Sequence, residues 1–228
     1  MDNGFVWKGS HSTDYGIVPE SLPQKSTAEA RVEKQVLPGR DGFLTVKDNS
    51  FEGQIKPVEF HMMDAAEVDS VKLWLTGTDR VIFSNQPDRY YKASIISKVD
   101  LAEIIPILHK GLVQFDCQPF GYLLKGEELI TITTPITLYN SGTYESEPYI
   151  KIYGTGDIIF RVNDQVLQIG GIADYVEIDT ELDEIYKGAE SFENASFGDT
   201  PLLQVGKNEI TWTGAITKIE IIPRWRCL

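Results

Sequence analysis

Histidine and cysteine, on which much enzyme and metal chemistry depends, are scarce in this 228-residue chain. The three histidines are His11, His61 and His109, and the two cysteines are Cys117 and Cys227. No histidine stands in a motif with a nucleophile, and neither cysteine has a Cys or His neighbour at metal-ligand spacing. No phosphate-binding loop or dinucleotide fingerprint occurs. The sequence therefore predicts a binding or structural protein rather than an enzyme, with no metal or cofactor and with reduced, buried thiols.

Positive charge and long apolar runs are also lacking. The chain has 21 Lys and Arg against 34 Asp and Glu, a net charge of −13. This balance argues against binding to the phosphates of nucleic acid and against docking on an anionic membrane. No apolar run approaches the roughly 18–20 residues that span a bilayer, and the N-terminus lacks the features of a secretory signal. We therefore expect a soluble, acidic protein.

What the sequence does contain is mostly the signal of short strands. In the first half, apolar or alternating runs are separated by Gly, Pro, Asp and Ser. The predicted strands are 5–7, 17–18, 31–37, 43–46, 54–62, 80–84, 90–98 and 112–120. The stretch Val36-Leu-Pro-Gly-Arg-Asp-Gly-Phe-Leu44 predicts a hairpin, because its two glycines can adopt the positive φ that a tight reversal needs.

One segment of the first half has the pattern of a helix. Asp64 and Glu67 match a capping box, and Val68, Val71, Trp74 and Leu75 then form one apolar stripe. The spacing predicts an amphipathic helix of about three turns that covers one face of a sheet, with Gly77 as the residue that ends it.

The second half has no convincing helix. Its predicted strands are 129–133, 149–153, 158–162, 166–169, 174–178, 202–204, 209–212 and 216–222, with a turn at Gly154-Thr-Gly156. Many short strands with regular turns are typical of a β-sandwich or barrel. Net charge changes from −4 over residues 1–124 to −9 over residues 125–228. These changes predict two domains, residues 1–126 and 127–228.

Carboxylates gather in one stretch, between Glu177 and Glu184. Val176, Ile178 and Leu182 fall on alternate positions, which predicts a strand whose other face meets water. That face would carry the carboxylates of Glu177, Asp179, Glu181 and Asp183. A calcium site and the acid pair of a glycosidase are the alternatives.

Aromatic residues of the second half are expected to pack in the core or at sheet edges, although lectins also stack sugars on such rings. Among them we single out Trp212 as a candidate contact for a sugar or a partner. The full set is Tyr139, Tyr144, Tyr149, Tyr153, Tyr175, Tyr186, Trp212 and Trp225.

The order of several motifs resembles the distal tail protein family of siphophages. In the first half, the matching stretches are Ser12-Thr-Asp-Tyr-Gly-Ile17, the hairpin 36–44, Pro87-Asp-Arg-Tyr-Tyr-Lys-Ala93 and Phe115-Asp-Cys-Gln-Pro-Phe-Gly-Tyr122. In the second half, Glu147-Pro-Tyr-Ile150, Tyr175-Val-Glu-Ile-Asp179 and Gly206-Lys-Asn208 match. This half has no histidine, so it departs from the His-x-Asn-x-Arg sugar site of true galectins, and the resemblance does not extend to sugar binding.

The resemblance implies a mainly β fold. It consists of an N-terminal β-sandwich-like domain with one α-helix and a projecting hairpin, and a C-terminal galectin-like, carbohydrate-module-like β-sandwich. It implies a baseplate hub, a homohexameric ring at the tip of a long non-contractile tail. The expected partners are further copies of the chain, the tail tube protein, a tail-associated lysin or fibre protein, and a receptor-binding protein. The expected location is the virion tail tip, after assembly in the bacterial cytoplasm.

Ring closure needs head-to-tail contacts, and exposed strand edges near the hairpin could supply them. The candidate interface residues are Pro38, Gly39, Arg40, Asp41 and Gly42. Six copies at −13 each would carry −78, so the interfaces would have to rely on apolar burial and backbone pairing.

Two other functions remain open at this stage. The alternative is a carbohydrate-binding module that helps a virion adhere to the host wall, with Trp212 as the residue to test. A glycoside hydrolase acting through Asp179 is the third.

Overall fold

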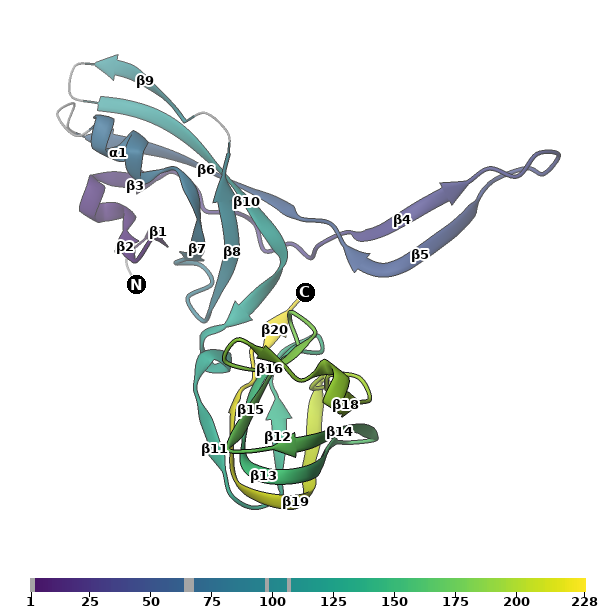
Figure 1. Cartoon of the computed structure of the whole chain (residues 1–228). Helices are drawn as coiled ribbons and strands as arrows, with labels where there is room; N and C mark the ends of the chain where they lie inside the picture. Colours follow the sequence, from purple (N-terminus) through teal and green to yellow (C-terminus); the bar gives the residue numbers. More distant parts are fainter. Residues whose placement is uncertain (1–2, 64–67, 97–98, 106–107) are drawn as a thin grey trace. The chain divides into compact units, whose positions relative to one another are not determined.

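The computed structural model describes residues 3–63, 68–96, 99–105 and 108–228 (Figure 1). The chain divides into two compact units: unit 1 is Met1–Gly121 with Leu228, and unit 2 is Tyr122–Cys227. Strands dominate both units, which confirms the predicted mainly β fold class with a single α-helix among the described residues.

Unit 1 is built on one large sheet. Its strands follow the order β2-β1-β7-β8-β10-β6-β3, and β9 also pairs with β10. The bounds are β1 Phe5–Trp7, β2 Ser10–His11, β3 Ile17–Pro19, β6 Gln54–Met63, β7 Gly77–Phe83, β8 Arg89–Ile95, β9 Asp100–Ile105 and β10 Leu108–Leu123, with a 3-10 turn at Ser12–Tyr15. Strands β4 (Ala30–Gln35) and β5 (Leu44–Phe51) form a separate two-stranded sheet.

Alternation along β10 places the core of unit 1 on one face of the sheet. Val113, Phe115 and Cys117 are buried, whereas Leu112 and Asp116, which alternate with them, are exposed. Around Phe115 the rings of Phe5, Trp7 and Phe83 pack edge to face, with centroids 5.2–5.6 Å apart. Such pairs add to the stabilisation that burial of the rings already supplies.

Helix α1 (Val68–Trp74) supplies the cover of this core. Val71, Trp74 and Leu75 are buried as the stripe predicts, and the indoles of Trp7 and Trp74 each donate to the other's backbone carbonyl, at 3.0 and 3.2 Å. The described helix has seven residues, about two turns rather than three. The predicted capping residues Asp64 and Glu67 lie outside the described residues.

The prediction that Gly77 ends the helix is wrong. The helix ends at Trp74, and Gly77 is the first residue of β7, with φ of +78°. Glycine is still needed at position 77, because the backbone there has a positive φ that other residues rarely adopt.

Both cysteines are free and buried, as predicted. Burial raises the pKa of the Cys117 thiol to about 12, although the nearby Lys56 ammonium opposes the shift. Because the thiolate is the reactive form, Cys117 is an inert core residue at neutral pH.

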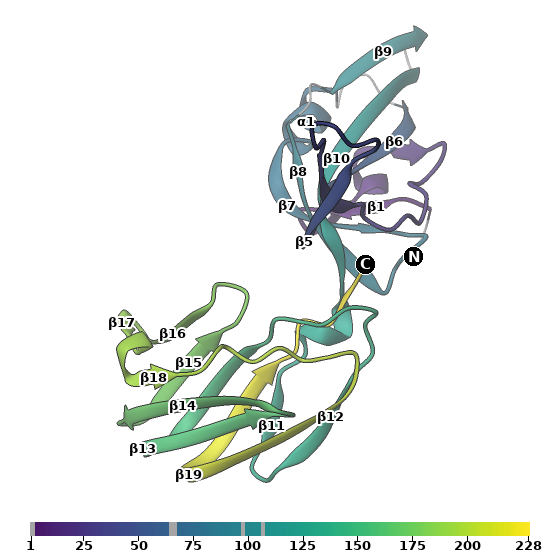
Figure 2. The same ribbon diagram turned by 90° about the vertical axis from the view of Figure 1, so that its right-hand side faces the viewer.

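Unit 2 is a second antiparallel structure, with the strand order β11-β19-β13-β15-β16-β17. β12 also pairs with β19, and β14 pairs with β13 and β18 (Figure 2). The bounds are β11 Ile130–Ile132, β12 Ile136–Asn140, β13 Tyr149–Val162, β14 Gln165–Ile172, β15 Tyr175–Asp179, β16 Glu184–Lys187, β17 Glu190–Ser191, β18 Ser196–Phe197, β19 Gly206–Ile222 and β20 Arg226–Cys227, with 3-10 turns at Leu124–Glu127 and Glu193–Ala195.

Two pairs of predicted strands in unit 2 are single long strands. Residues 149–153 and 158–162 both lie in β13, and residues 209–212 and 216–222 both lie in β19. The register of this pair shifts at Tyr153/Gly154 and again between Thr155 and Ile159. Gly156 and Gly214 adopt φ of +78° and +108° there, so the glycines form bulges that bend the strands without ending them. Residues 202–204 form no strand; Leu203 makes only an isolated bridge with Ser146.

The core of unit 2 is mostly aliphatic. Ile150 and Ile152 on β13 pack with Ile219 and Ile221 on β19, and all four are fully buried. Trp225 is also buried in this cluster. The alternate residues of the same strands therefore lie on the opposite face of the sheet.

Candidate functional site

The hairpin formed by β4 and β5 makes less packing contact with the rest of unit 1 than its other strands do. Its strands pair with each other and with no other described strand (Figure 1). Every residue from 29 to 49 is exposed. A two-stranded hairpin without further packing is only marginally stable in water. We call residues 30–47 the arm.

The tip of the arm is the turn that the sequence predicted. Gly39 and Gly42 have φ of +78° and +85°, and the Arg40 amide donates to the Leu37 carbonyl at 3.2 Å. No atom lies within 4 Å of a Cβ built on either glycine, so backbone conformation rather than space is the reason for glycine here. The proposed interface residues Pro38 to Gly42 thus lie together at the tip; their role in an interface stays a prediction.

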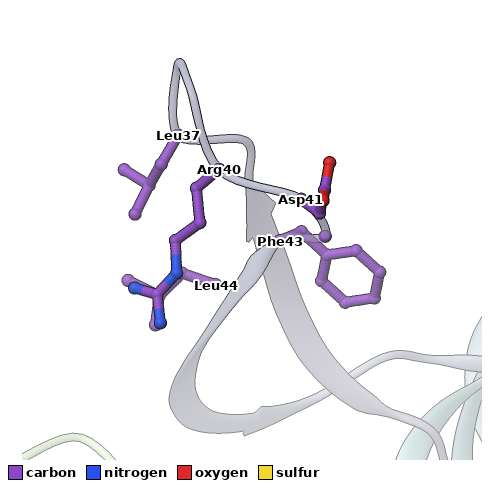
Figure 3. Close-up of a pocket in the computed structure, with 6 residues that line it drawn as sticks. Leu37, Arg40, Asp41, Phe43 and Leu44 are labelled. Atoms are coloured by element: carbon purple, nitrogen blue, oxygen red, sulfur yellow. The ribbon is translucent and has the colours of Figure 1, made fainter.

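The large apolar side chains that flank the tip are exposed, and the sequence reasoning did not single them out. Their exposed fractions run from 41% to 76%; they are Val32, Val36, Leu37, Phe43, Leu44 and Val46. With Arg40 and Asp41, several of them line a hollow of about 220 Å³ (Figure 3). The sequence carries a signal that could have identified them, because apolar residues occur on both faces of the predicted hairpin. A hairpin that packs on a core has apolar residues mainly on one face.

The base of the arm is held by short-range contacts. Arg31 donates to both carboxylate oxygens of Glu52, at 2.8 and 3.4 Å, and the Asp48 carboxylate accepts from the amide and hydroxyl of Ser50. The Phe51 ring meets Phe120 edge to face, with centroids 5.7 Å apart. The ring contact joins the base of the arm to strand β10, whereas the outer part of the arm is exposed throughout.

Trp212, the other residue singled out from the sequence, does not stand free. It is half-buried and packs against the aliphatic core of unit 2. A sugar-stacking platform needs an open ring face, which this packing reduces. A sugar or partner contact at Trp212 stays a prediction.

The acidic stretch 177–184 differs from its prediction. Strand β15 ends at Asp179, and a turn follows in which the Leu182 amide donates to the Asp179 carbonyl. The alternation therefore stops, and Leu182 is 63% exposed. The prediction that Asp179 faces water is wrong, because Asp179 is only 7% exposed. Arg224 donates to both of its carboxylate oxygens, at 2.6 and 3.1 Å.

Glu177 takes part in a row of paired charges on the face opposite the core. Lys151 on β13 lies directly between Glu177 on β15 and Glu220 on β19. Tyr149 and Lys151 donate to Glu177, and Tyr153 and Lys218 donate to Glu220. The row is internally satisfied, which is the behaviour of a well-ordered polar sheet face.

These contacts set the pKa values of three carboxylates. Burial raises the pKa of Asp179, but the hydrogen bonds and charge of Arg224 outweigh it and bring the pKa below 3.8. Burial likewise raises the pKa of Glu177, but the hydrogen bonds from Tyr149 and Lys151 outweigh burial and bring the pKa below 4.5. Hydrogen bonds from Lys218 and Tyr153 lower the pKa of Glu220.

The stability of unit 2 should therefore fall in acid. The folded pKa values lie below those of the unfolded chain, so the stabilisation is complete above the unfolded values and is lost as pH falls through the folded ones. We expect unfolding free energy to be flat above about pH 5 and to decline below about pH 4. Denaturant unfolding at several pH values measures this, followed by tryptophan fluorescence, to which Trp212 and Trp225 of unit 2 contribute. The Glu177→Gln, Glu220→Gln double variant should show a shallower acid slope; an unchanged slope would contradict the assignment.

No group of three or more His, Cys, Asp or Glu residues lies close enough to hold a metal ion, among the residues searched. His61 pairs instead with Glu20 at 2.9 Å, and His11 caps the 3-10 turn that follows it. No helix in the described part of the chain is long and apolar enough to cross a membrane.

Comparisons with known proteins bear on the fold. No protein-family model matches the sequence, and no curated protein matches it. A solved structure does match: the Dit (gp 19.1) protein of SPP1, with a TM-score of 0.75 and 15% sequence identity, over 96% of this chain and 97% of that chain. That structure is presented as a paradigm of the hub adsorption apparatus in phages that infect Gram-positive bacteria. The resemblance to siphophage distal tail proteins is thus confirmed at the level of fold: this chain has the fold of SPP1 Dit along nearly its whole length.

Proposed function

We propose that this chain is a distal tail protein, a structural hub of the baseplate at the tip of a long non-contractile phage tail. Residues 1–126 would form a homohexameric ring, and residues 127–228 would form a second, galectin-like domain. The ring would join the tail tube to the tail-associated lysin or fibre protein, with a receptor-binding protein as a further partner. The virion tail tip is its proposed location, after assembly in the cytoplasm of the bacterial host.

The observation that carries this proposal is the arm. An isolated two-stranded hairpin with six exposed large apolar side chains is not explained by the needs of its own domain. A surface of this kind is typical of a contact with another protein. The shared fold with SPP1 Dit, a protein of a hub adsorption apparatus, supports the same role.

The size of the assembled protein tests the proposal. Sedimentation of the full chain, alone and mixed with a tail tube protein, should reveal a species near six times the 25.6 kDa chain. A Leu44→Ser variant should shift this species toward the monomer, because a buried leucine contributes about 1.5–3 kcal/mol to each interface. Val205→Ser is the control and should leave the assembly unchanged, because Val205 lies in unit 2 and is 53% exposed, close to the 51% of Leu44. A strict monomer, also when tail components are present, would refute the hub.

A further inference from the structure

Aspartate or asparagine precedes glycine at two places in this chain, Asn3-Gly4 and Asp41-Gly42. At such a pair the backbone amide of the glycine can attack the side-chain carbonyl carbon of the residue before it and close a five-membered imide ring. Glycine favours the attack, because it has no Cβ to hinder the approach and its backbone reaches the required torsions at little cost. The reaction also needs an amide that is not held in place by hydrogen bonds.

The first pair is held in place. Gly4 is buried, its amide donates to Ser84 Oγ at 3.0 Å, and its carbonyl accepts from the Ser84 amide at 2.9 Å. The space around it is also filled, because a Cβ added at Gly4 would lie 2.5 Å from Ser12 Oγ. The Gly4 amide therefore reaches the Asn3 side chain only when this part of unit 1 opens.

The second pair has none of these restraints. Asp41 and Gly42 are both exposed, and neither the Asp41 carboxylate nor the Gly42 amide has a hydrogen-bond partner among the described residues. Beyond its chain neighbours, no atom lies within 4 Å of a Cβ built on Gly42. Figure 3 shows the Asp41 side chain extending from the turn at the tip of the arm. The tip of a two-stranded hairpin without further packing changes conformation readily.

We propose that Asp41-Gly42 is a site of spontaneous isomerisation, at which the peptide link moves from the α-carboxyl to the β-carboxyl group of Asp41. The Gly42 amide nitrogen attacks Cγ of the protonated carboxyl group; a C–N bond forms, a carboxyl C–O bond breaks, and one water leaves with the amide proton. Water then adds to the α-carbonyl of the ring, and the original peptide C–N bond breaks. Nothing is oxidised or reduced, and the product has the mass of the starting chain. This inference goes beyond the proposed function and does not depend on it.

The product has a different turn. Its main chain runs through Cβ of Asp41 and is one carbon longer between residues 41 and 42. The present turn is closed by the positive φ of Gly39 and Gly42, and it sets the register that places Gln35 opposite Leu44. A marginally stable hairpin has little free energy with which to keep its pairing when the turn changes. We therefore expect the amides of the arm to exchange hydrogen faster after isomerisation, while the amides of both cores exchange as before.

Ageing of the full chain tests the proposal. The purified chain is diluted until it sediments at the mass of one chain, so that no association covers the tip, and is then incubated at neutral pH. Peptide mapping follows the peptide that contains Asp41, and methylation by an isoaspartyl methyltransferase reports the new α-carboxylate. We expect an isomer of unchanged mass to accumulate at Asp41. The reaction at Asn3 is recorded in the same sample, because it releases ammonia and changes the mass.

Unfolding the chain in urea separates a free pair from a held one. The rate at Asp41 should change by less than about twofold, because the tip already moves freely in the folded protein. The rate at Asn3 should rise by about tenfold or more, because the folded structure holds the Gly4 amide closed for most of the time.

Two variants are the controls. Asp41→Glu keeps the negative charge but would have to close a six-membered ring, which forms much more slowly, so the isomer should be lost. Asp41→Asn keeps the ring size and releases ammonia instead of water, so it should react faster and be seen as deamidation at position 41. Because the Asp41 side chain is exposed and has no partner among the described residues, both variants should unfold like the wild type.

Each outcome decides the proposal. If no isomer accumulates at Asp41 in the monomeric wild type, or if Asp41→Glu gives the same product, the proposal is overturned. If urea accelerates the reaction at Asp41 as much as at Asn3, the folded arm holds this pair in place and the proposal fails as well. None of these results bears on the hub, which the size of the assembled protein tests separately.

Discussion

Replacing Trp74 with alanine is expected to destabilise unit 1 by about 3–5 kcal/mol, a large part of the stability of a typical domain. Trp74 is 7% exposed and stacks on Tyr15, with ring centroids 4.2 Å apart, and on Phe5, at 5.7 Å. Its removal opens a cavity between α1 and the sheet. It also leaves the Trp7 carbonyl without the indole donor that now lies 3.2 Å away.

The neighbouring residue supplies the control for this prediction. Leu73 lies on the same helix but is 76% exposed, so Leu73→Ala should change stability by no more than about 0.5 kcal/mol. Trp74→Phe keeps a smaller aromatic ring and loses the hydrogen bond and part of the buried volume, so its effect should lie between the two. Denaturant unfolding of the full chain, followed by circular dichroism, measures all three. Equal effects of Trp74→Ala and Leu73→Ala would show that α1 does not close the core.

Replacing Arg224 with methionine is expected to destabilise unit 2 by about 3 kcal/mol at pH 7. The substitution leaves the buried Asp179 carboxylate without its cationic partner, and breaking a buried ion pair costs about 3–5 kcal/mol. The lower value applies because the side chain of Arg224 is 23% exposed, which allows water to screen the remaining charge. Methionine retains most of the apolar stem, so the change tests charge rather than bulk.

The pH dependence of this effect separates charge from packing. Burial raises the pKa of Asp179, and without Arg224 only the backbone amides of Glu181 and Leu182 oppose it, so Asp179 in the variant takes up a proton at a higher pH than in the wild type. The difference in stability should therefore shrink as pH falls. Lys218→Met is the comparison, because the Lys218 side chain is 39% exposed and water screens its pairing with Glu220, so the loss of stability should be much smaller. A pH-independent loss in Arg224→Met would mean that the packing of Arg224, and not its charge, is what matters.

Features that depend on neighbouring residues could be predicted from the sequence. The turn at Gly39 and Gly42 follows from the torsional freedom of glycine, and the buried face of α1 follows from the spacing of Val71, Trp74 and Leu75. The mainly β class follows in the same way from alternation within short segments. The order of weak motifs along the chain was enough to identify the fold that SPP1 Dit shares.

Contacts between distant residues could not be predicted in this way. Asp179 can be buried because Arg224, 45 positions away, neutralises its charge. No residue near Asp179 in the sequence indicates that partner. The sequence predicts strand ends where β13 and β19 only bend. A glycine that forms a bulge and a glycine that forms a turn have the same local sequence pattern.

The arm shows the same division most clearly. Its sequence determined a hairpin, since the turn residues act within a few positions of one another. Whether its apolar side chains would be buried depended on what else in the chain could pack on them, and only the tertiary structure decided that Leu44 and Phe43 stay exposed on opposite faces. Conformational preference acts through bonded neighbours, whereas burial depends on the position of every other element, and so it is settled only when the whole chain has folded.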